Sequence, residues 1–149
     1  MDMWNRHSTE VQKEFLDACG NIGATMDGVY VNTLYGWREV KVGLISKRLF
    51  GDGVLPSQWD TRQLPELSTC VAFAVMEESG EFQQRWQYWR RHLRLGSTSD
   101  ISALGDGAAW IWNIIHDVFG SVRECLDVYH CLEHLSDAGK VLYGEGTES

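Results

Sequence analysis

The chain is poor in proline and has no long apolar run. Only two of its 149 residues are proline, whereas seven are tryptophan, and this composition argues against a disordered segment. No apolar run approaches the roughly 20 residues that a membrane-spanning helix needs. The beginning of the chain, "MDMWNRHSTEVQKEF", is polar and mixed in charge, which excludes a secretory signal sequence. These features predict a cytoplasmic protein that makes no membrane contact.

Basic residues and paired cysteines are also scarce. The 13 Lys and Arg are outnumbered by 21 Asp and Glu, giving a net charge of −8, so the overall field does not attract nucleic acid and any DNA contact needs a local patch. Four cysteines, at positions 19, 70, 125 and 131, have no framework spacing and are predicted to be free thiols. Cys70 lies in the apolar run "STCVAFAV" and is predicted to belong to the core.

The length of the chain suits one domain with its own core, and the periodicity of apolar residues predicts its elements. Strands are predicted over 22–33, 37–46, 69–77, 101–105 and 122–129, and helices over 4–19, 78–95, 108–119 and 130–144. The first two strands form a hairpin, 47–68 is a long loop, and the third strand is central and buried. This order predicts an α/β fold with a ribonuclease-H-like, five-stranded mixed sheet flanked by helices.

Two aspartates, Asp27 and Asp106, stand where apolar strand-like runs reach a glycine, in "IGATMDGVYV" and "DISALGDGAAWIWNII". In a ribonuclease-H-like sheet the first and fourth strands are neighbours, so the two carboxylates would repel each other unless a cation lay between them. Mg²⁺ prefers such oxygen ligands, and a pair of ions can clamp the oxygens of a phosphoryl displacement. The alternative is that each aspartate ends a strand before a turn or caps a helix, as Asp106 could near Ala108.

Three longer segments carry a family resemblance. "MDGVYVNTLYGWREVKVGLISKR", "LGDGAAWIWNIIHDVFG" and "LDVYHCLEHL" together resemble the catalytic domain of DDE-type transposases of bacterial insertion sequences, closest to the Kra group and distantly similar to Mutator-like enzymes. The resemblance implies a partial catalytic domain over 22–149, preceded by a remnant helix over 1–21. It also implies DNA cleavage at transposon ends and strand transfer into target DNA, with two Mg²⁺ or Mn²⁺ ions in the complete enzyme and with Asp27 and Asp106 as the catalytic, metal-binding residues.

The chain also departs from the family pattern. The third carboxylate of the family is a glutamate beyond the last predicted helix, and neither Glu133, Glu145 nor Glu148 occupies that place. The expectation is therefore a transposase truncated at both ends, with a fold incomplete at its C-terminus and no activity on its own. Two alternatives stay open. One is a noncatalytic module that binds DNA, associates with itself or joins a full-length transposase; the other is a nuclease completed by Glu39 or Asp127.

A second cluster follows the fifth predicted strand. His130 and His134 are four residues apart, so they share one face of a helix, and Cys131 and His134 resemble the C-x-x-H feature of Mutator-like enzymes. Three readings are open: contact with DNA near the active-site end of the sheet, a structural role, or a zinc site that adds Cys125. Asp127 could orient one of the histidines.

The strongest basic concentration lies in the predicted helix over 78–95. Arg90, Arg91 and Arg94, interleaved with aromatic residues, could bind the phosphate backbone of DNA; the alternative is a solvated helix face. Near the second strand, Glu39 and Lys41 lie on one strand face and are predicted to form an ion pair.

Overall fold

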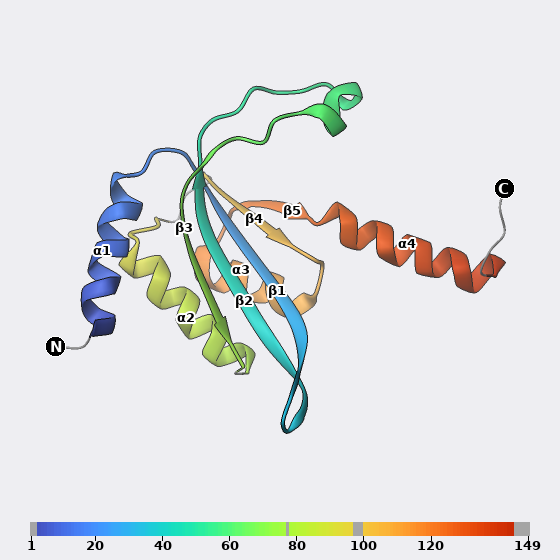
Figure 1. Ribbon diagram of the computed structural model, residues 1–149, viewed down its shortest axis with the longest axis horizontal. Coiled ribbons are helices and arrows are strands. Elements are labelled where there is room, and N and C mark those ends of the chain that lie inside the picture. The colour runs from blue at the N-terminus through green and yellow to red at the C-terminus, as the bar shows by residue number, and fades with distance from the viewer. Residues whose placement is uncertain (1–2, 77, 97–99, 145–149) are drawn as a thin grey trace.

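The computed structural model describes residues 3–76, 78–96 and 100–144, and they form one five-stranded sheet with helices (Figure 1). The strands are β1 (Asn21–Thr33), β2 (Gly36–Arg48), β3 (Leu67–Val75), β4 (Ile101–Gly105) and β5 (Arg123–Leu126). The helices are α1 (Met3–Asp17), α2 (Ser79–His92), α3 (Ala109–Phe119) and α4 (Val128–Tyr143), and a short 3₁₀ helix, η1 (Pro56–Thr61), lies in the long loop.

The sheet is mixed, as the sequence predicts. Its strand order is β3-β2-β1-β4-β5. β1 and β2 form an antiparallel hairpin, β3 continues it antiparallel, and β4 and β5 are parallel to β1. The predicted α/β class, the five-stranded mixed sheet and the flanking helices are therefore confirmed.

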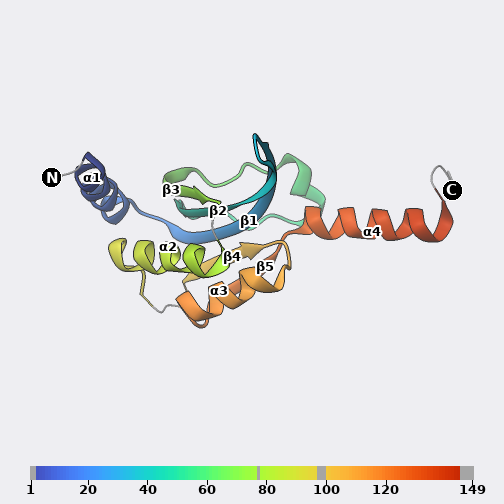
Figure 2. The same ribbon diagram turned by 90° about the horizontal axis from the view of Figure 1, so that it is seen from below.

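The core lies between the sheet and two helices, α2 and α3, which cover the same face of it (Figure 2). On α2 the buried residues Phe82, Trp86 and Trp89 recur at three to four positions, which puts them on one side of the helix. α3 buries Ile111 and Ile115 in the same way. Neither helix covers the opposite face of the sheet, which is called the open face below. Side chains on the covered face pack against α2 and α3, and side chains on the open face do not.

Two expectations about β3 are corrected. β3 is an edge strand, not a central one, and Cys70 on it is exposed, because its apolar residues alternate between the covered and the open face. On β2 the face that carries Lys41 is the covered one, and Lys41 is only 7% exposed. The polar residues at the outer end of β2 thus belong to the covered side, where an ion pair satisfies the buried ammonium group.

The end of the chain also differs from the prediction. β5 stops at Leu126, and α4 begins at Val128 instead of residue 130, because the Asp127 carboxylate accepts a hydrogen bond from Tyr129 N and caps the helix. α4 runs through Gly139 without a break. It leaves the body of the molecule (Figures 1 and 2) and has no buried residue. Among the described residues, no helix has the length and apolar character needed to cross a membrane.

Candidate functional site

Asp27 lies in β1, and Asp106 directly follows β4, the parallel neighbour of β1 in the sheet. The last paired residues of β1 and β4 are Thr25 and Leu104, and each aspartate follows two residues later. Because side chains alternate along a strand, each aspartate points to the same side of the sheet as the paired residue before it. Asp27 stays within β1, where it pairs with Val42 of β2, so it does not end the strand.

Both carboxylates lie on the open face of the sheet. The residues just before them, Met26 and Gly105, are buried on the covered face, so the aspartates point away from α2 and α3. Asp27 is exposed and Asp106 is half-buried. The open face is therefore accessible to a cation and to a large substrate where these carboxylates stand.

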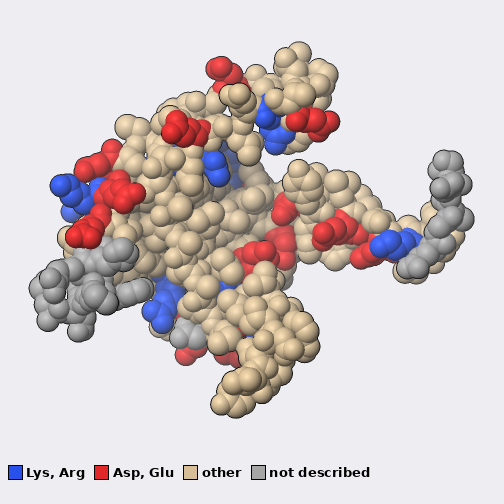
Figure 3. Space-filling model, viewed as in Figure 1, with Lys and Arg blue, Asp and Glu red and all other residues tan. Residues whose placement is uncertain are grey.

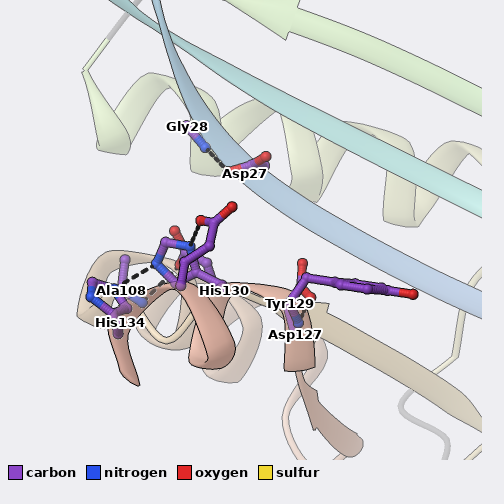
Figure 4. A network of polar contacts seen from close by, with 9 residues as sticks. Asp27, Gly28, Ala108, Asp127, Tyr129, His130 and His134 are labelled. Atoms are coloured by element: carbon purple, nitrogen blue, oxygen red, sulfur yellow. Dashed lines mark hydrogen bonds and ion pairs between the residues drawn. The ribbon is translucent and has the colours of Figure 1, made fainter. Parts of the chain in front are cut away.

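One oxygen of each carboxylate is held by a backbone amide (Figure 4). Gly28 N donates to Asp27 Oδ1 at 2.7 Å, and Ala108 N donates to Asp106 Oδ1 at 2.8 Å. Within the described part of the chain, the other oxygen of each has no hydrogen bond or ion pair of its own. The expectation that Asp106 caps the helix is wrong, because the N-cap of α3 is Ala108 with no side-chain cap; Asp106 binds the amide of that N-cap residue, and its second oxygen is available as a ligand.

A third aspartate, Asp127, stands at the end of the next strand, β5. Gly105 of β4 pairs with Leu126 of β5, so Asp127 follows β5 as Asp106 follows β4, and Asp127 N donates to Gly105 O at 2.9 Å. The side chain of Asp127 is directed to Tyr129 N, 2.9 Å away. Across the described residues, no group of three or more His, Cys, Asp or Glu side chains is arranged to hold a metal ion. In this conformation the site therefore offers a pair of carboxylates with Asp127 beside it.

Glu39 is not placed to complete that pair. It lies on the covered face of β2, opposite to the face of Asp27, and its Oε2 is 2.7 Å from Lys41 Nζ. Lys41 Nζ also lies 5.6 Å from the centroid of the Trp110 ring. The predicted Glu39–Lys41 pair is confirmed, and this arrangement does not favour the alternative in which Glu39 completes the site.

The two histidines of α4 lie at the same end of the sheet as Asp106. A cavity of about 710 Å³ is lined by Asp106, Gly107, Ala108, Leu126, His130, Cys131, His134 and Leu135. His130 Nε2 and His134 Nε2 are 2.9 Å apart. Cys125 is absent from this lining and belongs to a different cavity, beside Thr25 and Ser102, so the zinc arrangement that needed Cys125 is not formed.

The basic cluster lies elsewhere. Arg90 and Arg91 stand in the last turn of α2, and Arg94 follows the helix at a positive φ of 53°. This segment leads into the start of β4, whereas the aspartates lie at the opposite end of the strand. Figure 3 shows acidic side chains where α4 joins the body. The arginine cluster thus lies away from the two aspartates, and contact of the arginines with DNA stays a prediction.

No protein-family model matches the chain, and no curated protein gives a significant sequence match. The resemblance to transposases therefore stays a prediction from the sequence segments quoted above. The sequence suggested Asp127 only as one alternative for completing the site, since its alignment with Asp106 requires the register of β4 and β5.

Proposed function

We propose that this chain is the core of a DDE-type DNA transposase, with a ribonuclease-H-like sheet on which Asp27 and Asp106 hold Mg²⁺ or Mn²⁺. The single observation that carries the proposal is the register of β1 and β4, because it puts the two aspartates at equivalent positions on adjacent strands and on the open face. Two carboxylates that come close to each other at the ends of adjacent strands would favour a shared divalent cation over two unpaired charges.

The chain's own groups would prepare such a site. The amides of Gly28 and Ala108 each fix one carboxylate oxygen, which orients the remaining oxygen toward the open face. A bound ion would polarise the scissile phosphate and help to form the attacking nucleophile. It would also offset local negative charge, which otherwise repels DNA from a protein of net charge −8.

A site with two carboxylates is expected to hold its ions weakly, and the chain alone is proposed to be inactive or nearly so. Asp127 could complete the site if its side chain turned away from Tyr129 N, to which it is now bonded at 2.9 Å. The other source of a third ligand is a full-length transposase associated with this chain. Asp127→Asn discriminates between the two, because only the first requires the Asp127 carboxylate.

Ion-dependent binding of DNA tests the proposal directly. With a fluorescent DNA duplex, millimolar Mg²⁺ is expected to raise the affinity of the wild-type chain at least about tenfold over EDTA, since the ion replaces carboxylate–phosphate repulsion by a bridge. In Asp106→Asn this gain should vanish. Fluorescence anisotropy at constant ionic strength measures both.

Asp117→Asn is the matched control, because Asp117 on α3 is exposed and bonded to Gln83 at 3.2 Å, away from the open face. The control should keep the full Mg²⁺ dependence. DNA binding that is equal in Mg²⁺ and EDTA, or absent in both, would contradict the proposed function.

A second candidate function, self-association, is favoured by a different observation. α4 is an amphipathic helix of 16 residues with no buried residue, and Val128, Leu132, Leu135 and Leu142 are 53%, 56%, 68% and 74% exposed along one side of it. An isolated helix of this length is only marginally stable in water. A contiguous apolar stripe on its surface marks an interaction site. We propose that the stripe packs against the α4 of a second copy of this chain.

Charged residues in the stripe should therefore dissociate the dimer. Leu132→Glu/Leu135→Glu removes apolar burial worth roughly 1.5–3 kcal/mol per leucine, so the dissociation constant should rise at least about 100-fold. Sedimentation velocity measures the shift. Val141→Glu is the matched control, since Val141 is 86% exposed but lies outside the stripe; it should leave the dimer intact. A wild-type chain that is monomeric at high micromolar concentration would refute this candidate.

A further inference from the structure

The histidine pair of α4 has the geometry of a chelate. His130 and His134 are separated by one helical turn, their Nε2 atoms are 2.9 Å apart and their ring centroids 4.5 Å apart. We infer that His130 and His134 form a binding site for a borderline divalent transition ion, with Zn²⁺ and Ni²⁺ as members of the class. The inference does not depend on the transposase proposal, which concerns oxygen ligands and Mg²⁺.

The distance between the two nitrogens suits this role. Zinc binds imidazole nitrogen at 2.0–2.1 Å in a tetrahedral arrangement, which sets two nitrogens roughly 3.3 Å apart. The 2.9 Å separation therefore needs to widen by only a few tenths of an ångström, which small rotations of the exposed rings allow. Without an ion, one ring nitrogen donates its proton to the other, so the pair is held in place either way.

The second nitrogen of His130 lies near a carboxylate. Its Nδ1 is 3.8 Å from Glu133 Oε2, and the His130 and His134 rings stand edge to face, at 89° to each other (Figure 4). Metal-binding histidines usually present their other nitrogen to a carboxylate, which fixes the tautomer and raises the basicity of the ligand. At 3.8 Å, Glu133 is within ion-pair range of His130 but beyond hydrogen-bond distance, so its exposed side chain would have to move closer to take this role.

The donor types select the ion. Imidazole suits zinc, nickel and copper, whereas Mg²⁺ requires oxygen ligands. The two imidazoles line the same cavity as Asp106 and Cys131. An ion held there keeps open positions for water or for an anionic group of a ligand, and it also links two successive turns of α4.

Calorimetric titration with Zn²⁺, and separately with Ni²⁺, tests the inference on the reduced full chain. The wild type should bind one ion of each kind. His134→Gln and His130→Gln should each weaken binding at least about tenfold, the size of effect that follows even the loss of an outer partner of a metal ligand. Far-ultraviolet circular dichroism should show more helix on addition of Zn²⁺ to the wild type, and no gain in His134→Gln.

Two further variants make the result decisive. His116→Gln removes an imidazole on α3 that is bonded to Glu124 at 2.7 Å, and it should leave the affinity unchanged. Cys131→Ser should also retain binding, since the ligands are the two imidazoles. Loss of binding in Cys131→Ser, equal binding in His134→Gln and wild type, or no binding up to millimolar ion would each overturn the inference.

Discussion

Mn²⁺ should bind the wild-type chain in calorimetry and give no measurable binding heat with the double variant Asp27→Asn/Asp106→Asn. Asparagine keeps an oxygen that can accept the hydrogen bonds from Gly28 N and Ala108 N, so the local backbone is preserved. It removes both negative charges, which provide most of the attraction for a hard cation. The expected effect is therefore complete loss of binding without loss of the fold.

The affinity of the wild type should be in the millimolar range, because only a pair of carboxylates is aligned. The control is Asp52→Asn/Asp60→Asn, which makes the same change in net charge at exposed positions of the long loop. It should bind Mn²⁺ as the wild type does. If the site variant and the control bind equally, the ions are held by the acidic surface in general and the paired site does not exist.

The largest expected effect on stability comes from Trp86→Ala. Trp86 is fully buried, and its ring centroid lies 5.1 Å from that of Phe73 and 5.7 Å from that of Phe119. The Trp86 ring packs against Gly43 of the sheet, which leaves room for it because glycine has no side chain. A Cβ added at Gly43 would lie only 2.9 Å from a carbon of the Trp86 ring. Truncation removes aromatic contacts and leaves a cavity that this glycine cannot fill, at a cost of about 3–5 kcal/mol.

Such a loss is a large part of the 5–15 kcal/mol that typically stabilises a domain, so the variant should be partly unfolded near 37 °C. Urea denaturation followed by circular dichroism measures the change in the free energy of unfolding. Trp37→Ala provides the comparison, because Trp37 is 69% exposed on the hairpin. This substitution should lower the free energy of unfolding by no more than about 0.5 kcal/mol. A cost for Trp86→Ala below about 1 kcal/mol would contradict the described core.

Local pattern was sufficient to predict most elements. Alternation in 22–33 and 37–46 predicted the β1–β2 hairpin, and the spacing of Phe82, Trp86 and Trp89 predicted the buried side of α2. The adjacency of β1 and β4 was predicted from the ribonuclease-H-like order of elements and not from the residues around either aspartate. Such pairing depends on contacts distant in sequence, which local patterns do not encode.

The errors have specific physical causes. The apolar run around Cys70 contains small residues that tolerate an exposed strand face, so hydrophobicity alone misplaced β3 in the centre of the sheet. Asp127 is a typical N-cap residue, and this signal was available before α4, but the apolar run through Val128 was assigned to the strand. Nothing in the sequence indicated that α4 would leave the body of the molecule, because packing direction is a tertiary property.

The parallel pairing of β1 with β4 also has a consequence for the order of folding. The β1–β2 hairpin can form from local contacts. Pairing of Thr25 with Leu104 closes a long loop, and because this closure costs conformational entropy, the pairing is expected to form late in folding. Asp27 and Asp106 are therefore far apart in partly folded chains and meet only when the sheet is complete. An ion bound between them recognises the native state alone, so it shifts the folding equilibrium toward that state by mass action.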